Sequence, residues 1–271
     1  MNLDLDRRQR AILDEMGVHV WWPETPPAAV AATPAAMASA MPAPKSVARA
    51  APEPGPAPAP VAATAVERVS SLDWATLAQT VAACTACGLS AGRRSAVFAA
   101  ALAPHSAHWM VVGEPPDDNE ERLGLPFAGQ AGQLLDNMLK AVGVRRGGHD
   151  GAAAEAAGAA YVSNCVKCRP ALARNPEPQE LAACENYLQR EVALVRPKVI
   201  LALGRFAAQT LLQGSLPDVA GTPLGKLRGR IYRYQGIPVI VSYHPAYLLR
   251  TPQDKARAWA DLCLAMSALA A

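Results

Sequence analysis

Four short apolar segments constrain the fold of this 271-residue chain more than any other feature. They are HWMVVGE (108–114), YVSNCVK (161–167), KVILALG (198–204) and the second half of IYRYQGIPVIVSYHP (231–245). Strands that are buried on both faces form nearly continuous apolar runs, whereas half-buried strands alternate apolar and polar residues. The sequence therefore predicts an α/β fold, a three-layer α/β/α sandwich with a mainly parallel central sheet.

Segments with helical spacing of their apolar residues separate these strands. They are LDWATLAQTVAAC (72–84), AGQLLDNMLKAVG (131–143), PQELAACENYLQREVALVR (178–196), GRFAAQTLL (204–212) and DKARAWADLCLAMSALA (254–270). In the first of them, Leu72, Leu77 and Val81 share one face, and Asp73 or Ser71 can cap the start of the helix. The last strand is expected to form a hairpin with the strand before it.

The ends of the predicted strands carry the candidate ligand-binding residues. Gly113 and Glu114 end the first strand, Asn164 lies near the end of the second, and His244 follows the last. In open α/β sheets, ligands bind outside the carboxyl ends of the strands. We therefore expect these residues to meet at one site.

The N-terminal part of the chain has a different composition from the rest. Residues 23–60 hold 11 of the 24 prolines, interspersed mainly with alanine. Proline lacks a backbone donor, and Ala and Pro offer little apolar area to bury. We expect a disordered tether over 23–66, a folded domain over 67–271, and a separate peptide over 1–22.

Overall composition excludes several classes of protein. A net charge of +3 with 51% hydrophobic residues does not fit a wholly disordered chain. No run of 18 or more apolar residues occurs without proline or charge, so no membrane span is expected. The start of the chain, MNLDLDRRQR, is charged and lacks the apolar core of a secretory signal, which favours a cytoplasmic location.

Charge is unevenly distributed within the predicted domain. Residues 67–165 contain 7 Lys/Arg and 10 Asp/Glu, a net of −3, whereas residues 166–271 contain 14 and 7, a net of +7. Because Lys and Arg release counterions when they bind phosphates, a basic half suggests a polyanionic partner such as nucleic acid.

The six cysteines include two C-x-x-C pairs. Four thiolates brought to one point can hold zinc or an iron–sulfur cluster. Two quartets are possible: Cys84, Cys87, Cys165 and Cys168, or Cys84, Cys87, Cys168 and Cys184. If the strand continues through Lys167, Cys165 and Cys168 point to opposite faces, which disfavours the first quartet.

Several blocks of the sequence together resemble family 4 uracil-DNA glycosylases, the iron–sulfur type of bacteria and archaea. The blocks are GEPPDDNEERLGLPFAGQAGQLLDNML (113–139), YVSNCVKCRP (161–170), RPKVILALGR (196–205) and HPAYLLR (244–250). The resemblance implies the fold of that family and a structural 4Fe-4S cluster. The implied ligands are Cys84, Cys87, Cys168 and Cys184, with Cys165 and Cys263 as buried bystanders.

The resemblance also implies an activity: a monofunctional glycosylase of base excision repair flips uracil out of DNA and hydrolyses its N-glycosidic bond, leaving an abasic site. Phe127, one of three Phe, would stack on the flipped base in a pocket that includes Gly113. The amide of Asn164 would donate to uracil O4 and accept from N3–H. His244 would donate to O2, where negative charge grows as the bond breaks.

Two acids and one loop complete the implied site. Glu114 matches the acid of the first motif, and Glu120 matches a second acid that positions water or stabilises the sugar cation. In the HPAYLLR loop, an apolar residue (Leu248 or Leu249) would fill the vacated stack while Arg250 holds a phosphate.

The first motif departs from the family pattern at two positions. Family members usually read GEAPG, whereas this chain reads GEPPD, so Pro115 replaces a small residue and Asp117 replaces glycine. Glycine would allow positive φ or a close approach of the backbone to the substrate. The change therefore bears on the rate and the substrate range more than on the reaction class.

The N-terminal segment RRQRAILDEMGVHVWW (7–22) combines an amphipathic helical pattern with Trp21 and Trp22. It resembles the N-terminal peptide of the psi subunit of bacterial DNA polymerase III, which attaches psi to the clamp loader. An apolar peptide ahead of a long tether is typical of segments that fold on binding a partner. We expect a monomer in the bacterial cytoplasm, associated with the nucleoid and docked to the clamp loader through residues 1–22.

Two alternatives from other functional classes remain open at this point. A non-catalytic replisome adaptor is one, because psi itself resembles a glycosylase fold without activity. A zinc-stabilised nucleic-acid-binding module is the other, and metal content would separate it from an iron–sulfur enzyme.

Overall fold

A computed structural model describes residues 69–99, 107–147 and 158–270. The predicted docking peptide (1–22) and the predicted tether (23–66) lie outside these residues, so the proposed domain boundaries stay predictions. None of the described helices is both long and apolar enough to cross a membrane.

In the described part of the chain, six strands form one sheet. The strands are β1 (Trp109–Gly113), β2 (Arg145–Arg146), β3 (Ala159–Asn164), β4 (Val199–Leu203), β5 (Ile231–Tyr234) and β6 (Ile237–Ser242). Their order across the sheet is β2-β3-β1-β4-β6-β5. All neighbouring pairs are parallel except the β5–β6 hairpin. The predicted mainly parallel sheet and its final hairpin are confirmed.

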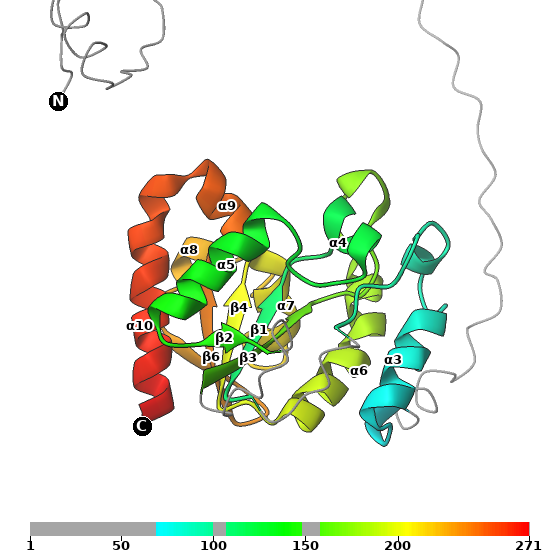
Figure 1. Cartoon of the computed structure of the whole chain (residues 1–271), viewed down its shortest axis with the longest axis horizontal. Coiled ribbons are helices and arrows are strands. Elements are labelled where there is room, and N and C mark those ends of the chain that lie inside the picture. The colour runs from blue at the N-terminus through cyan, green and yellow to red at the C-terminus, as the bar shows by residue number, and fades with distance from the viewer. Residues whose placement is uncertain (1–68, 100–106, 148–157, 271) are drawn as a thin grey trace, which may run out of the picture. The chain divides into compact units, whose positions relative to one another are not determined.

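Helices surround this sheet (Figure 1). The α-helices are α3 (Trp74–Ala83), α4 (Asp118–Leu123), α5 (Gln130–Ala141), α6 (Pro178–Val195), α7 (Arg205–Leu212), α8 (Leu224–Leu227), α9 (Pro245–Arg250) and α10 (Lys255–Ala270). Short 3-10 helices are η1 (Gly88–Ser90), η3 (Ala171–Ala173) and η4 (Pro252–Asp254). Asp73 caps α3 as predicted, since its carboxylate accepts a hydrogen bond from Thr76 N at 2.8 Å.

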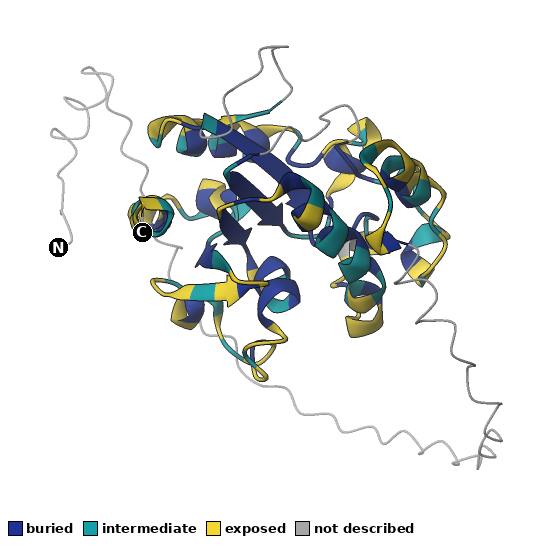
Figure 2. Ribbon diagram, turned by 90° about the horizontal axis from the view of Figure 1, so that it is seen from below, coloured by how far each residue is buried: buried dark blue, intermediate teal, exposed yellow. Residues whose placement is uncertain are grey.

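Alternate residues of the central strands enter two separate apolar cores. On one face, Met110 and Ile200 pack among side chains of α3, α6 and α7. On the other, Val111 and Leu201 pack among side chains of α5 and α10. Figure 2 shows the central strands almost wholly buried between these helices, with the β5 edge exposed. This arrangement confirms the predicted three-layer sandwich.

Strand β3 ends earlier than predicted. The strand stops at Asn164, and the chain bends through Cys165–Cys168 instead of continuing to Lys167. The side chain of Lys167 folds back over the strand end, where its Nζ donates to Asn164 O at 3.0 Å and to Ser163 Oγ at 2.5 Å. The argument that placed Cys165 and Cys168 on opposite faces of a strand is therefore wrong in its premise.

Candidate active site

The candidate residues follow strands that are neighbours in the sheet. Gly113 at the end of β1 pairs in register with Asn164 at the end of β3. On the other side of β1, β4 is followed by Gly204, and next to it β6 leads to His244. Because these strands are parallel, their carboxyl ends meet at one edge, which is where the sequence predicts the ligand site.

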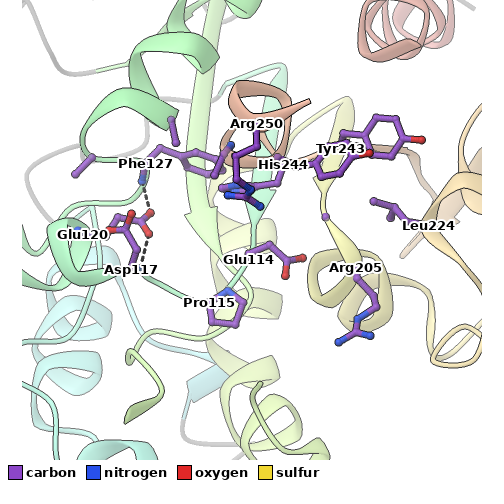
Figure 3. Close-up of a pocket in the computed structure, with 15 residues that line it drawn as sticks. Glu114, Pro115, Asp117, Glu120, Phe127, Arg205, Leu224, Tyr243, His244 and Arg250 are labelled. Carbon is purple, nitrogen blue, oxygen red and sulfur yellow. Dashed lines mark hydrogen bonds between the residues drawn. The ribbon is translucent and has the colours of Figure 1, made fainter. Parts of the chain in front are cut away.

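A cavity of about 470 Å³ opens at this edge. Of the predicted residues, Glu114, Glu120, Phe127, His244 and Arg250 line it, as Figure 3 shows. Asn164 lies directly behind the wall, since its amide nitrogen donates to Glu114 O at 2.9 Å and to Glu120 Oε1 at 3.2 Å. The structure thus brings the predicted base-binding residues together.

Phe127 occupies an unusual backbone conformation on the cavity wall. Its φ is +53°, which is a rare value for a bulky residue. The ring lies so close to Gly113 that a Cβ at that position would be 2.5 Å from it, which explains the glycine. The ring also stacks on His244, with centroids 5.3 Å apart. A planar base between two rings needs about 7 Å, so a bound base must lie at the edge of this pair or displace one ring.

Two charged side chains hold Phe127 in this conformation. Glu120 accepts a hydrogen bond from Phe127 N, and Arg146 donates to Phe127 O at 3.1 Å. Arg146 is itself fixed by a two-pronged ion pair with Asp136, at 2.5 and 2.6 Å. The sequence did not point to Arg146, because its neighbours in the chain form no pattern that predicts a hydrogen bond to the loop containing Phe127.

Glu120 is a buried anchor whose two oxygens are both used. Oε2 accepts from Asp117 N at 2.8 Å, while Oε1 accepts from Phe127 N and from the amide of Asn164. Burial raises the pKa of Glu120, and these donors act in the opposite direction. The geometry makes Glu120 a residue that positions Asn164 and Phe127, and it leaves little room for the predicted role of holding water.

Asp117, which replaces the family glycine, has a clear structural role. Its φ is −90°, so this position does not need the left-handed geometry that glycine allows. Its carboxylate accepts from Glu120 N at 2.9 Å, and with the return bond from Asp117 N to Glu120 this forms a capping box at the start of α4. The side chain also lines the cavity.

The nitrogen and the oxygen of the Asn164 amide differ in their hydrogen bonding. Both hydrogens of Nδ2 are donated within the protein, to Glu114 O and Glu120 Oε1. The oxygen Oδ1 is buried and has no partner among the described residues. The predicted donation to uracil O4 is therefore not available in this arrangement, whereas the predicted acceptance from an N–H group is.

The carboxyl group of Glu114 lies against the start of α7. It accepts a hydrogen bond from Phe206 N at 2.8 Å, and it packs so closely on Gly204 that any Cβ there would clash with it. Burial raises the pKa of Glu114 to about 7, although this hydrogen bond and Arg205 favour the charged form. An acid with this pKa can exchange a proton at neutral pH.

His244 is a neutral hydrogen-bond donor. Burial, with a smaller effect from Arg250, lowers the pKa of His244 to about 4, so the ring carries no charge at neutral pH. Its Nδ1 accepts from Ala246 N at 3.3 Å, where it caps α9. The single ring proton therefore resides on Nε2, which is the nitrogen free to donate to a ligand.

The predicted DNA-contacting residues lie on α9. Leu249 is 41% exposed, and Arg250 is exposed at the cavity mouth. Leu248 is only 1% exposed and lines an apolar pocket between α5 and α10 with Met138 and Leu262. The structure therefore does not support the prediction for Leu248, because helical packing turns its side chain inward.

A second, smaller cavity is lined by the four predicted metal-binding cysteines, Cys84, Cys87, Cys168 and Cys184. Three of their sulfurs accept hydrogen bonds: Cys168 Sγ from Arg93 at 3.1 Å, Cys184 Sγ from Lys167 N at 3.4 Å, and Cys84 Sγ from Ala86 N at 3.5 Å. Cys165 is fully buried, as predicted, and does not line this cavity. Cys263 lies in α10 and is only partly buried, so the prediction that it is buried is wrong.

The arrangement of these four cysteines bears on which metal group they could hold. A single zinc ion needs sulfurs about 2.3 Å from one point. In the described residues, no three Cys, His, Asp or Glu side chains are grouped for a single ion. Four thiols around a common cavity, with N–H donors to three of them, fit a multi-atom iron–sulfur cluster.

The fold and the cavity define a class of α/β protein with a ligand site at the carboxyl edge of its sheet. Comparison with known proteins specifies it further. A family model described as the uracil DNA glycosylase superfamily matches residues 100–263. The type-4 uracil-DNA glycosylase of Archaeoglobus fulgidus is 39% identical over 151 residues, which cover 54% of this chain and 69% of the relative.

Two further relatives have the same type. The type-4 uracil-DNA glycosylase of Thermotoga maritima is 35% identical over 184 residues, covering 67% of this chain and 85% of the relative. That of Pyrobaculum aerophilum is 36% identical over 159 residues, covering 57% and 74%. The chain belongs to the uracil DNA glycosylase superfamily and, within it, to the type-4 family.

Proposed function

We propose that this protein removes uracil from DNA by hydrolysing the N-glycosidic bond, which leaves an abasic site. The observation that carries this proposal is the unpaired oxygen of Asn164, a buried acceptor whose amide hydrogens are already fixed. A buried polar atom without a partner is costly unless a ligand supplies one. The N3–H of uracil is a donor of the required kind, whereas N3 of cytosine carries a lone pair.

His244 stabilises the leaving base in this proposal. When the C1′–N1 bond of the nucleotide breaks, both bonding electrons remain on uracil, and the charge spreads to O2. The neutral imidazole donates from Nε2 to this oxygen, and no proton has to be lost or gained beforehand. A preplaced donor of this kind contributes more to the transition state than to the ground state.

We assign to Glu114 the role of activating the water molecule that attacks the sugar. In its ionised form the carboxylate takes a proton from the water molecule that attacks C1′, so the sugar gains a hydroxyl group. Its pKa of about 7 leaves a large ionised fraction at neutral pH. Glu120 is the weaker candidate, because both of its oxygens already accept hydrogen bonds within the protein.

We further propose that Cys84, Cys87, Cys168 and Cys184 hold a 4Fe-4S cluster. The cluster would serve a structural role by tying α3 and α6 to the loop after β3. Arg93 and the backbone N–H groups of Ala86 and Lys167 would stabilise the thiolates.

An oligonucleotide assay tests the activity. A labelled strand with a single deoxyuridine should give an alkali-sensitive site after incubation, and matched strands with thymidine or deoxycytidine should not. Intact strands after alkali would contradict the proposal. Breakage without alkali would contradict the monofunctional assignment.

The N-terminal residues support one more proposal, made from sequence alone. Residues 1–22 would dock on the clamp loader of DNA polymerase III, placing a monomeric enzyme on nucleoid DNA. The test is capture of purified clamp-loader subunits by the full chain, compared with a variant carrying alanine at Trp21 and Trp22. Equal capture by both chains would refute this docking.

A non-catalytic adaptor is not favoured. The named relatives are glycosylases, and the chain keeps Phe127 and His244 on the cavity wall with Asn164 directly behind it. A protein retained only for docking would have no reason to keep a buried, unpaired acceptor beside that cavity.

A further inference from the structure

The segment between β3 and α6 contains a residue that neither the catalytic cavity nor the cysteine cavity explains. Leu172 lies in η3 and is 98% exposed, more than any other large apolar residue of the described chain. Its φ of +54° and ψ of 25° are left-handed, a conformation that a leucine rarely adopts. An apolar side chain is thus held in water by a strained backbone, and both features are unfavourable in the free protein.

The surrounding loop holds Leu172 in this position. Pro170 and Pro176 are buried on either side of it. Arg174 forms a two-pronged ion pair with Glu180 at the start of α6, at 2.8 and 2.6 Å. Arg169 contacts Asp118 at 3.3 Å and Glu121 at 3.4 Å on α4. The loop is therefore anchored on two helices, and its apolar tip is preorganised for contact with something outside the chain.

The position of this loop identifies its partner. The loop follows Asn164 directly, and Arg169 fastens it to α4, whose cap Asp117 lines the catalytic cavity. In Figure 1 it rises beside α4 at the same end of the sheet as α9. The loop that carries Leu172 is thus fastened to α4, and the exposed Leu249 lies on α9, the helix whose Arg250 lines the same cavity. We therefore expect a strand that delivers a base into the cavity to contact both of these leucines.

We propose that Leu172 is a second apolar contact with DNA, which packs against the exposed bases that flank the flipped nucleotide. This inference rests on the proposed glycosylase function. Flipping one base out of the stack exposes the apolar faces of its neighbours, and side chains such as leucine fill such gaps. Because the loop is already ordered, the contact needs little further loss of conformational freedom.

Substitution of Leu172 separates this role from a structural one. Leu172→Asn removes the apolar group but tolerates left-handed geometry, so the folded protein should be as stable as wild type or more stable. Binding to an oligonucleotide that carries an uncleavable abasic analogue should weaken about tenfold. Leu172→Met, the matched control, keeps an apolar side chain and should bind like wild type. Inhibition by free uracil should stay unchanged in both variants.

A fluorescent base locates the contact. With 2-aminopurine beside the abasic analogue, wild type and Leu172→Met should change its fluorescence alike, and Leu172→Asn should change it less. If wild type releases uracil but Leu172→Asn binds DNA as tightly as Leu172→Met, the inference is overturned, and the exposed leucine serves another partner. If wild type releases no uracil, the glycosylase proposal itself has failed.

Discussion

The catalytic cavity and the cysteine cavity lie on the two sides of the bend that ends β3, and they differ in how their polar groups are satisfied. Around the catalytic cavity, burial raises the pKa of Glu114 and lowers that of His244, and the oxygen of Asn164 has no partner. Around the cysteine cavity, three of the four sulfurs already accept N–H hydrogen bonds. The first cavity thus has a buried acceptor without a partner, whereas the sulfurs of the second have hydrogen-bond donors, although burial still raises the pKa of the Cys168 and Cys184 thiols.

Lys167 joins the two cavities. Its backbone N–H donates to Cys184 Sγ, while its Nζ donates to the backbone oxygen of Asn164. The same Nζ pairs with Glu191 at 2.7 Å, and both side chains are almost fully buried. Lys167 therefore links the strand end that carries Asn164 to a cysteine on the wall of the second cavity.

The largest expected effect is on the groups that hold the base. Asn164→Ala and His244→Ala should each lower the single-turnover rate of uracil release by about 10³-fold, because each removes a preplaced partner of the leaving base. Thermal unfolding of both variants should confirm that they fold. Rates near that of wild type in both variants would show that neither side chain holds the leaving base, and the contrast drawn between the two cavities would fail.

The pH dependence of Glu114 is the second test. As a base, Glu114 must be ionised, so kcat/KM should rise with pH and level off above about 7. Glu114→Gln should lower the plateau about 10²-fold and remove this break, whereas His244 should add none above pH 5. A break that persists in Glu114→Gln would assign it to another group.

Protein stability gives an independent readout of the same carboxyl group. Its pKa in the folded state is raised from 4.5 to about 7, so the folded protein binds this proton more tightly than the unfolded chain does. The contribution of Glu114 to unfolding free energy therefore falls as pH rises from 4.5 to about 7. Glu114→Gln should gain stability relative to wild type at pH 8, but not at pH 4, in urea titrations.

The third test concerns the cysteine cavity. Cys168→Ala should abolish the broad visible absorbance of an iron–sulfur protein and lower the melting temperature, while Cys165→Ala should retain the absorbance. Chelation or oxidation of wild type should act like Cys168→Ala. Iron content should be measured beside zinc, and a colourless wild-type protein that contains zinc would overturn the cluster.

The smallest expected effect is at Asp117. Asp117→Gly restores the family residue but removes one half of the capping box, and because glycine is itself tolerated at an N-cap it should cost only about a few tenths of a kcal/mol of unfolding free energy. Asp117→Asn keeps a capping oxygen and should lose less. If Asp117→Asn releases uracil faster than wild type, the Asp117 carboxylate repels the substrate backbone, because the amide keeps the capping oxygen and removes only the charge.

Local patterns predicted the central strands and long helices, because continuous apolar runs and helical periodicity depend only on nearby residues. Asp73 as a cap is of this kind. The short helices α4, α8 and α9 were missed, since a few residues cannot show a period. The end of β3 was also missed, because it is set by the fold-back of Lys167 rather than by propensity.

The candidate site divides in the same way. Glu114, Asn164 and His244 could be expected at one edge, because parallel strands end together. The sequence could not show that Glu120 is saturated, that Arg146 holds Phe127, or that Leu248 is buried, since each depends on partners distant in the chain. Tyr243 also lines the cavity. The sequence could have predicted this, because Tyr243 directly precedes His244 at the end of the same strand.

The buried pair of Lys167 and Glu191 makes the end of β3 sensitive to substitution of either partner. Removing either partner from such a pair strands a charge in the interior, at about 3–5 kcal/mol. Nζ of Lys167 also donates to Asn164 O, so the loss of Glu191 would disturb the residue that fixes the end of this strand.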